Sequence, residues 1–239
     1  MMRSTAQGNL QLVTDGLIFY YDIANPNSYS TYNGIELKSL ARIDDYILPE
    51  NGSSAIIDPS VIYSADYSGG LTCNDSGYIQ CPGFADMSNS SYTIELVISP
   101  DTLNNITPID ENYIIKSDSA EGLFIKYSET DQTQLRISSD SAPGKTNYPT
   151  NMQANNYIYQ FLLTYNVGTG YFQTYVGLDP EINELKSNEW VSIHYPFKIG
   201  YNFETFKLFQ FRIYNKVLST TEIGINREQF RRRYGNELA

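Results

Sequence analysis

The stretch from Phe206 to Glu222 constrains the fold most, because a strand pattern there changes abruptly into the start of a helix. Residues 208–214 alternate as they would in a half-buried strand. The predicted faces are Phe209, Phe211 and Ile213 on one side and Leu208, Gln210, Arg212 and Tyr214 on the other. Ser219 and Glu222 then have the spacing of a capping box, in which each side chain satisfies a backbone N–H group at a helix start. The sequence therefore predicts a strand followed by a short C-terminal helix.

Aromatic residues favour strands in the rest of the chain as well. The 239 residues include 21 tyrosines and 11 phenylalanines. Tyrosine suits a pleated sheet surface that is partly exposed to solvent better than it suits a helix interior. Apolar or alternating runs bounded by turn residues occur at 17–21, 92–100, 113–116, 122–127, 134–138, 157–165 and 171–176, which predicts short strands. We expect one all-β sandwich domain, because sandwiches commonly reach this length and no internal repeat divides the chain.

Two distant segments carry a family resemblance. Residues 211–223, FRIYNKVLSTTEI, resemble the closing signature of LamG-like (laminin G/concanavalin A-type) jelly-roll domains, roughly V-R-I-Y-N-R-A-L-S-x-x-E-I. Residues 12–29 are similar to the first strand and loop of such domains in tailed-bacteriophage virion proteins, and residues 92–100 to the family strand F-T-I-S-A-W-V-K-P. The resemblance implies a concanavalin A-like jelly-roll β-sandwich of two antiparallel sheets with a short C-terminal helix.

This resemblance also sets the expected domain bounds: an N-terminal arm at 1–11, the LamG-like domain at 12–219, and a C-terminal helix and tail at 220–239.

Cys73 and Cys81 straddle Gly77 and are expected opposite each other in a hairpin similar to one of the family. They would form either a disulfide or, in better agreement with a reducing compartment, two small core residues.

Charge restricts the partners. The formal net charge of −11 and the pI of about 4.5 argue against nucleic acid, because phosphate binding needs a basic face. No apolar run approaches the roughly 20 residues that cross a bilayer, and the start lacks the apolar core of a secretory signal. The one basic run, Arg231 to Arg233, is either the solvated last turn of a helix or a docking contact to an acidic neighbouring subunit.

The sequence shows no catalytic constellation. Glycoside hydrolysis needs two converging carboxylates, but the E-x-D-x-E motif of related glucanases is absent and Glu95 is the only acid in its strand. Glu181 and Glu184 lie in a polar segment where solvated acids are common. The single histidine, His194, has no G-x-S-x-G partner motif. We expect that the protein is not an enzyme.

Calcium stays open, because LamG and legume-lectin relatives often bind it through Asp and Asn on loops at one rim. The oxygen-rich candidates are Asn74 and Asp75, Asp110 to Asn112, and Asp179 with Glu181. None has the internal spacing of a specific calcium loop, and ordinary turn chemistry explains them equally well. We therefore expect no obligatory cofactor.

Two functions are consistent with these observations. The resemblance favours a non-enzymatic structural protein of a tailed-phage virion, acting as a capsid decoration, auxiliary or tail accessory subunit through contacts with major capsid or tail proteins. Such a protein would assemble in the bacterial host cytoplasm, remain in the virion, and could be a homo-oligomer. The alternative is a glycan-binding adhesin that recognises host surface polysaccharide through loop aromatics. Its candidate residues are Tyr148, Trp190, Tyr195 and Tyr201.

Overall fold

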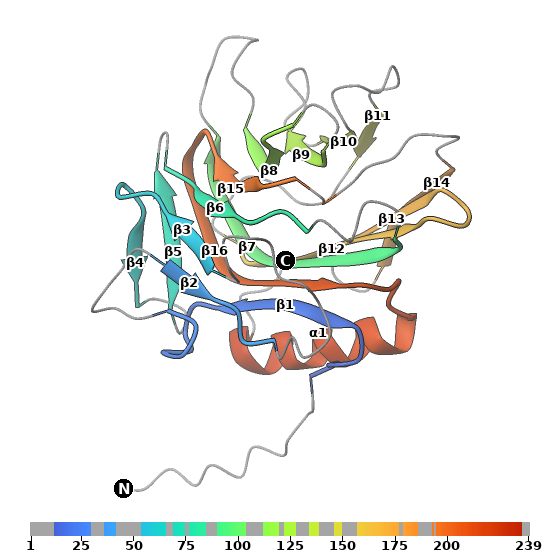
Figure 1. Ribbon diagram of the computed structural model, residues 1–239, viewed down its shortest axis with the longest axis horizontal. Helices are drawn as coiled ribbons and strands as arrows, with labels where there is room; N and C mark the ends of the chain where they lie inside the picture. Colours follow the sequence, from blue (N-terminus) through green and yellow to red (C-terminus); the bar gives the residue numbers. More distant parts are fainter. Residues whose placement is uncertain are drawn as a thin grey trace, which may run out of the picture.

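The chain folds into two packed antiparallel sheets with one helix on the outside (Figure 1). The computed structural model describes residues 12–29, 36–41, 54–65, 69–74, 77–84, 90–103, 112–119, 122–127, 134–138, 146–149, 157–176, 179–185, 193 and 195–235. Within these ranges every strand pairing is antiparallel. The predicted all-β sandwich is confirmed.

Each sheet has eight strands among the described residues. Sheet A has the order β14 (Asp179–Leu185), β13 (Tyr171–Val176), β12 (Tyr159–Asn166), β7 (Tyr92–Leu103), β16 (Phe203–Tyr214), β5 (Gly70–Asn74) and β4 (Ile62–Ser64), and β1 (Leu17–Asp22) also pairs with β16. Sheet B has the order β11 (Thr146–Pro149), β10 (Gln134–Ser138), β9 (Phe124–Tyr127), β8 (Tyr113–Ser117), β15 (Phe197–Tyr201), β6 (Ile79–Cys81), β3 (Ser54–Ile57) and β2 (Glu36–Lys38).

A row of isoleucines forms the inner face of sheet B. Five neighbouring strands place an isoleucine at the same register level, and all five side chains are buried. They are Ile57, Ile79, Ile199, Ile115 and Ile125. Burying one such side chain contributes about 1.5–3 kcal/mol. The row packs in one core with residues of sheet A such as Leu96, Phe211 and Ile213, which fixes the two sheets face to face.

Strand β16 departs from the predicted alternation at one point. The register against β7 runs from Leu208 opposite Ile98 directly to Gln210 opposite Val97, so Phe209 is an extra residue. Such a bulge changes the face that the next side chains occupy. Leu208 therefore joins the inner core and Phe209 packs on the outer side of sheet A. The predicted faces were right from Gln210 onward and wrong for Leu208 and Phe209.

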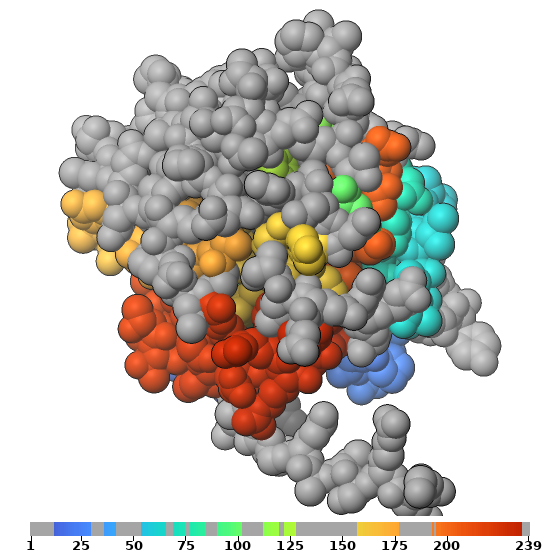
Figure 2. All heavy atoms as spheres, turned by 180° about the vertical axis from the view of Figure 1, so that it is seen from behind, coloured from blue at the N-terminus to red at the C-terminus, as the bar shows by residue number. Residues whose placement is uncertain are grey.

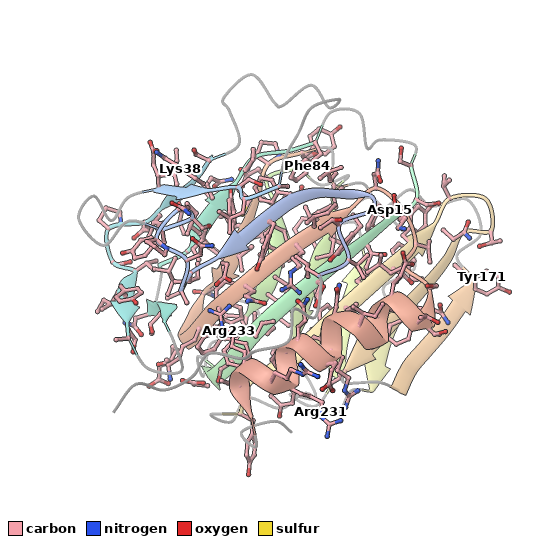
Figure 3. All side chains as sticks on the ribbon, turned by 90° about the horizontal axis from the view of Figure 1, so that it is seen from below. Asp15, Lys38, Phe84, Tyr171, Arg231 and Arg233 are labelled. Carbon is pink, nitrogen blue, oxygen red and sulfur yellow. The ribbon has the colours of Figure 1, made fainter. Side chains whose placement is uncertain are left out.

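Helix α1 (Thr220–Tyr234) covers the outer face of sheet A (Figures 1 and 3). The predicted capping box is confirmed: Glu222 N donates to Ser219 Oγ at 3.3 Å, and Ser219 N donates to Glu222 Oε2 at 2.8 Å. The helix buries one stripe, Ile223, Asn226, Phe230 and Tyr234, at the spacing of a single helix face. Figure 2 shows the helix in red as a ridge along the lower part of the molecule.

Cys73 and Cys81 lie in different sheets of the sandwich. Cys73 lies in β5 of sheet A and Cys81 in β6 of sheet B, so the predicted hairpin between them was wrong; the chain crosses from one sheet to the other between Asn74 and Ile79. Both thiols are free and fully buried, which confirms the interpretation as small core residues. Burial raises the pKa of both thiols.

In the described part of the chain, no helix has the length and apolar character to cross a membrane.

Candidate functional site

Among the described residues, one cluster of polar side chains is buried between α1 and sheet A. Arg212 Nη1 donates to Glu95 Oε1 at 2.8 Å, and Gln160 Nε2 donates to the same oxygen at 2.6 Å. Asn226, on the helix, donates from Nδ2 to Glu95 Oε2 at 2.9 Å and to Tyr214 Oη at 2.8 Å. Burial alone lowers the pKa of Arg212, but the charge of Glu95 and the nearby Tyr20 and Tyr214 together outweigh burial, so the pKa is raised overall. Glu95, alone in its strand by sequence, is thus paired across strands.

The same network continues to the end of β1. Arg233, in the last turn of α1, donates to both carboxylate oxygens of Asp22, at 2.8 and 2.9 Å. Asp22 also accepts from Tyr20 Oη at 3.1 Å and Gln210 Nε2 at 3.3 Å. Arg212 Nη2 donates to Gln210 Oε1 at 2.7 Å, which links the two halves.

This buried network holds the helix and offers no binding site. Glu95 is 1% exposed and Arg212 3% exposed, so neither is accessible to a ligand. Both carboxylates of the network are already engaged by arginines, Glu95 by Arg212 and Asp22 by Arg233. The network therefore anchors α1 on sheet A.

The second cluster lies on the outer face of sheet B and is called here the tyrosine–lysine face. Its members are Tyr78, Gln80, Tyr113, Lys116, Asp118, Lys198 and Tyr201. They come from β6, β15, β8 and the residues beside them, and each is at least partly exposed. Side chains alternate along a strand, so the isoleucines that face the core direct Gln80 and Lys198 outward. A register shift in β8 places Tyr113 and Lys116 on that same side.

Tyrosine rings and lysine ammonium groups interleave on this face. Tyr201 lies 5.8 Å from Tyr78 and 6.2 Å from Tyr113, measured between ring centroids. Lys116 Nζ lies 4.3 Å from the Tyr201 centroid and 4.9 Å from that of Tyr113. Lys198 Nζ lies 4.8 Å from the Tyr78 centroid. These distances are those of cation–π contacts.

Polar contacts fix the edge of the face. Gln80 Nε2 donates to Asp118 Oδ2 at 2.9 Å and to the Phe197 carbonyl at 3.3 Å. Lys198 Nζ lies 3.6 Å from Asp118 Oδ1. Toward β9 the surface closes, because Phe124 and Lys126 are buried. The accessible part is therefore centred on β15 and its two neighbours.

Of the four glycan-binding candidates, the structure places one on this face. Tyr201 ends β15, whereas Tyr195, half-buried, precedes the other end of that strand. Tyr148 lies in β11 with its side chain outside the description, and Trp190 lies outside the described residues. Sequence reasoning missed Tyr78, Tyr113 and the lysines. The alternation of 78–81 and 197–199 could have indicated the outward direction of Tyr78 and Lys198.

The other candidates from the sequence are the arginines proposed for docking, the single histidine and the acidic residues. Some of them are described by the structure and others lie outside the described residues. Arg231 and Arg232 are exposed, and Arg232 pairs with Glu228 one turn earlier, at 3.1 Å. Arg233 donates to Asp22, so its guanidinium group is already engaged within the chain. Figure 3 shows Arg231 extending away from the helix. His194, Asp75, Asp110, Glu111 and the side chains of 179–185 lie outside the description. Among the described residues, no three His, Cys, Asp or Glu side chains gather as metal ligands.

Comparison with known proteins gives structural relatives. No protein-family model and no curated protein sequence matches the chain. The structure is similar to Trypanosoma rangeli sialidase in complex with sialic acid, with a TM-score of 0.62 and 17% identity over 90% of this chain and 33% of that one. It is also similar to the binding domain of Paraclostridial Mosquitocidal Protein 1, with a TM-score of 0.66 and 16% identity over 93% of this chain and 53% of that one.

A third similar structure is of botulinum neurotoxin type C, whose cell entry is dependent upon interaction with two ganglioside molecules. Its TM-score is 0.67 and its identity 14%, over 91% of this chain and 52% of that one. The chain thus spans between a third and about half of these relatives. Identities this low show the fold alone, which is a jelly-roll β-sandwich.

Proposed function

We propose that the protein is a non-enzymatic carbohydrate-binding module that binds glycan through the tyrosine–lysine face. The observation that carries the proposal is the row of three contacting tyrosine rings, Tyr78, Tyr201 and Tyr113, on an accessible sheet surface. Tyrosine offers an apolar ring to the C–H face of a sugar and a hydroxyl group to its oxygens. Gln80, Asp118 and the lysines add the few oriented polar groups that such a site needs.

The structural relatives support this choice of ligand class. The sialidase structure contains sialic acid, and the neurotoxin study concerns gangliosides, which are sugar-bearing lipids. The step from their ligands to this chain is our proposal.

The absence of turnover is also part of the proposal. Glycoside hydrolysis uses two carboxyl groups that flank the scissile bond. On the tyrosine–lysine face the described carboxylate is Asp118, and Glu95 and Asp22 are bound by arginines beneath the helix. This arrangement favours retention of a sugar over its cleavage.

We further propose a setting for this binding: display on a tailed-phage virion, where the module would contact host polysaccharide. The motivating observation is the strand and capped helix of residues 203–234, which have the layout of the LamG-like closing signature. Arg231 and Arg232 are the candidates for docking on capsid or tail proteins, as a decoration or tail accessory subunit. Electron microscopy of intact particles tests this setting, and a particle without density for the chain would contradict it.

The binding proposal is tested with a glycan array followed by calorimetric titration of the best ligand. Tyr201→Ala and Tyr113→Ala each remove one ring from the row and should weaken binding by at least about tenfold, or about 1.4 kcal/mol. Tyr171→Ala is the matched control, because Tyr171 is an exposed tyrosine on β13 of sheet A (Figure 3).

Two results would contradict the proposal. Equal losses in all three variants would place the ligand elsewhere. Release of reducing sugar from the bound glycan would show an enzyme instead of a binding module.

A further inference from the structure

We infer that the tyrosine–lysine face selects an anionic saccharide, whose carboxylate or sulfate group lies between Lys116 and Lys198. This inference rests on the proposed function and adds the charge class of the ligand. It arises from the two lysines, whereas the proposed function rests on the tyrosines.

Lys116 and Lys198 lie directly opposite each other on β8 and β15. Directly opposed residues on antiparallel strands have Cβ atoms about 4.5–5.5 Å apart, and like charges in this position are destabilising. The chain carries 27 acidic and 16 basic residues, so adjacent cations run against its overall charge. An anion between the two ammonium groups would remove their repulsion.

The local acids leave this positive charge partly uncompensated. Within the described part of the chain, no carboxylate oxygen lies within salt-bridge distance of Lys116 Nζ, whose contacts are the rings of Tyr113 and Tyr201. Lys198 has Asp118 at 3.6 Å, and the Asp118 side chain is 40% exposed. Exposed pairs of this kind contribute about 0–1 kcal/mol. Lys116 is therefore the cation that a ligand anion meets first.

The tyrosines also orient the lysines. Cation–π contacts with two rings hold the Lys116 ammonium group over the face, and Lys198 has the same relation to Tyr78 and Tyr201. Side chains held before the ligand arrives lose less entropy on binding. The rings and the charges thus form one surface, suited to a sugar that carries an acidic group.

A long polyanion such as nucleic acid fits this surface less well. Its affinity comes from many phosphate contacts, whereas the net charge of −11 repels an extended anion outside this patch. A short acidic oligosaccharide presents its charge only where the lysines lie.

The test compares three probes by calorimetric titration of the full chain: 3′-sialyllactose, 3′-sulfated lactose and lactose. We expect at least one acidic probe to bind at least about tenfold more tightly than lactose, with an affinity that falls as salt increases. The stronger of the two acidic probes identifies the carboxylate or the sulfate as the preferred group.

Two variants assign the charge. Lys116→Met and Lys198→Met keep the side-chain length and remove the ammonium group. Each should weaken the acidic probe at least about tenfold and leave lactose within about twofold. The matched control is Lys207→Met: Lys207 lies on β16 of sheet A, pairs with Asp101 at 2.6 Å, and is 25% exposed against 24% for Lys198. It should change neither affinity.

The outcomes separate the two proposals. If lactose binds as tightly as the acidic probes and only Tyr201→Ala weakens it, the charge inference is wrong and carbohydrate binding stands. If Lys207→Met weakens the acidic probe as much as Lys116→Met does, the attraction is a general charge effect and the inference also fails. If neither the probes nor a glycan array shows binding, both proposals fail. Unchanged circular dichroism spectra exclude misfolding of the variants.

Discussion

Replacing Arg212 by methionine tests the role of the buried network most directly. Arg212→Met keeps most of the apolar stem and removes the guanidinium group that Glu95 contacts at 2.8 Å. The carboxylate then remains buried with two neutral donors, Gln160 and Asn226. A buried charge without its counter-charge is costly, whereas the intact pair gains little over apolar residues of the same size.

The expected loss follows from this geometry. Two unit charges at 2.8 Å attract by about 6 kcal/mol at an effective dielectric constant of about 20, and the desolvation of both groups offsets part of this attraction. Removal of one partner of a buried pair costs about 3–5 kcal/mol. Since whole domains are stable by about 5–15 kcal/mol, Arg212→Met should lower the free energy of unfolding by a large fraction.

The assay is urea unfolding followed by far-ultraviolet circular dichroism, for Arg212→Met, Glu95→Gln and the double variant. We expect the double variant to lose at least about 2 kcal/mol less than the sum of the single losses, since the removed groups interact. Arg232→Met is the control, because its pair with Glu228 is about half exposed and should contribute under about 1 kcal/mol. A loss below about 1 kcal/mol in Arg212→Met, with additive single losses, would refute the reasoning.

Three further predictions concern the helix and strand β15. Hydrogen bonds from Lys216 and from the backbone of Ser219 lower the pKa of Glu222 from 4.5 to about 2. The contribution of the Glu222 carboxylate to stability is therefore present above about pH 4.5 and lost as the pH falls toward 2. Unfolding measured from pH 6 to 2 should depend less on acid in Glu222→Gln than in the unmodified protein, and an unchanged profile would contradict this. Gly200→Ala places a Cβ 2.5 Å from the buried ring of Phe206 at a φ of +72° and should lower the free energy of unfolding by at least about 2 kcal/mol. Gly224→Ala, whose added Cβ meets no atom within 4 Å, should instead stabilise the helix by about 0.5–1 kcal/mol. Similar melting temperatures of the two variants would count against this. Arg233→Met removes the pair with Asp22 and should speed hydrogen exchange in the last turns of α1, while unchanged exchange would show that apolar packing alone holds that end.

Local signals in the sequence were sufficient to predict several elements. The capping box lies within four residues and involves only its own side chains and backbone, so Ser219 and Glu222 identified the helix start correctly. The strand at 92–100 was predicted from its own alternation and is β7. These features depend on neighbours in the chain and were therefore visible without the fold.

Other features depend on which strands lie side by side. The bulge at Phe209 is defined by the register of β16 against β7, which no local pattern contains. Cys73 and Cys81 looked like a hairpin because turn-forming residue types lie between them in the sequence, although β5 and β6 belong to different sheets.

The candidate site was predicted only in part for the same reason. Tyr201 was selected as a loop aromatic, but its partners Tyr78 and Tyr113 are 123 and 88 positions away in the sequence. Their approach follows from β15 lying between β6 and β8. The sequence thus named one ring and could not assemble the row.

Because α1 occupies one broad side of the sandwich, the two sides of the molecule differ in what they offer. An anchor joined near Tyr234 would lie on the side opposite the tyrosine–lysine face. A protein held by that end would point its tyrosines outward, toward whatever approaches from solution. Many copies fixed in this way on one surface would present parallel, weak contacts whose combined strength exceeds that of any single one.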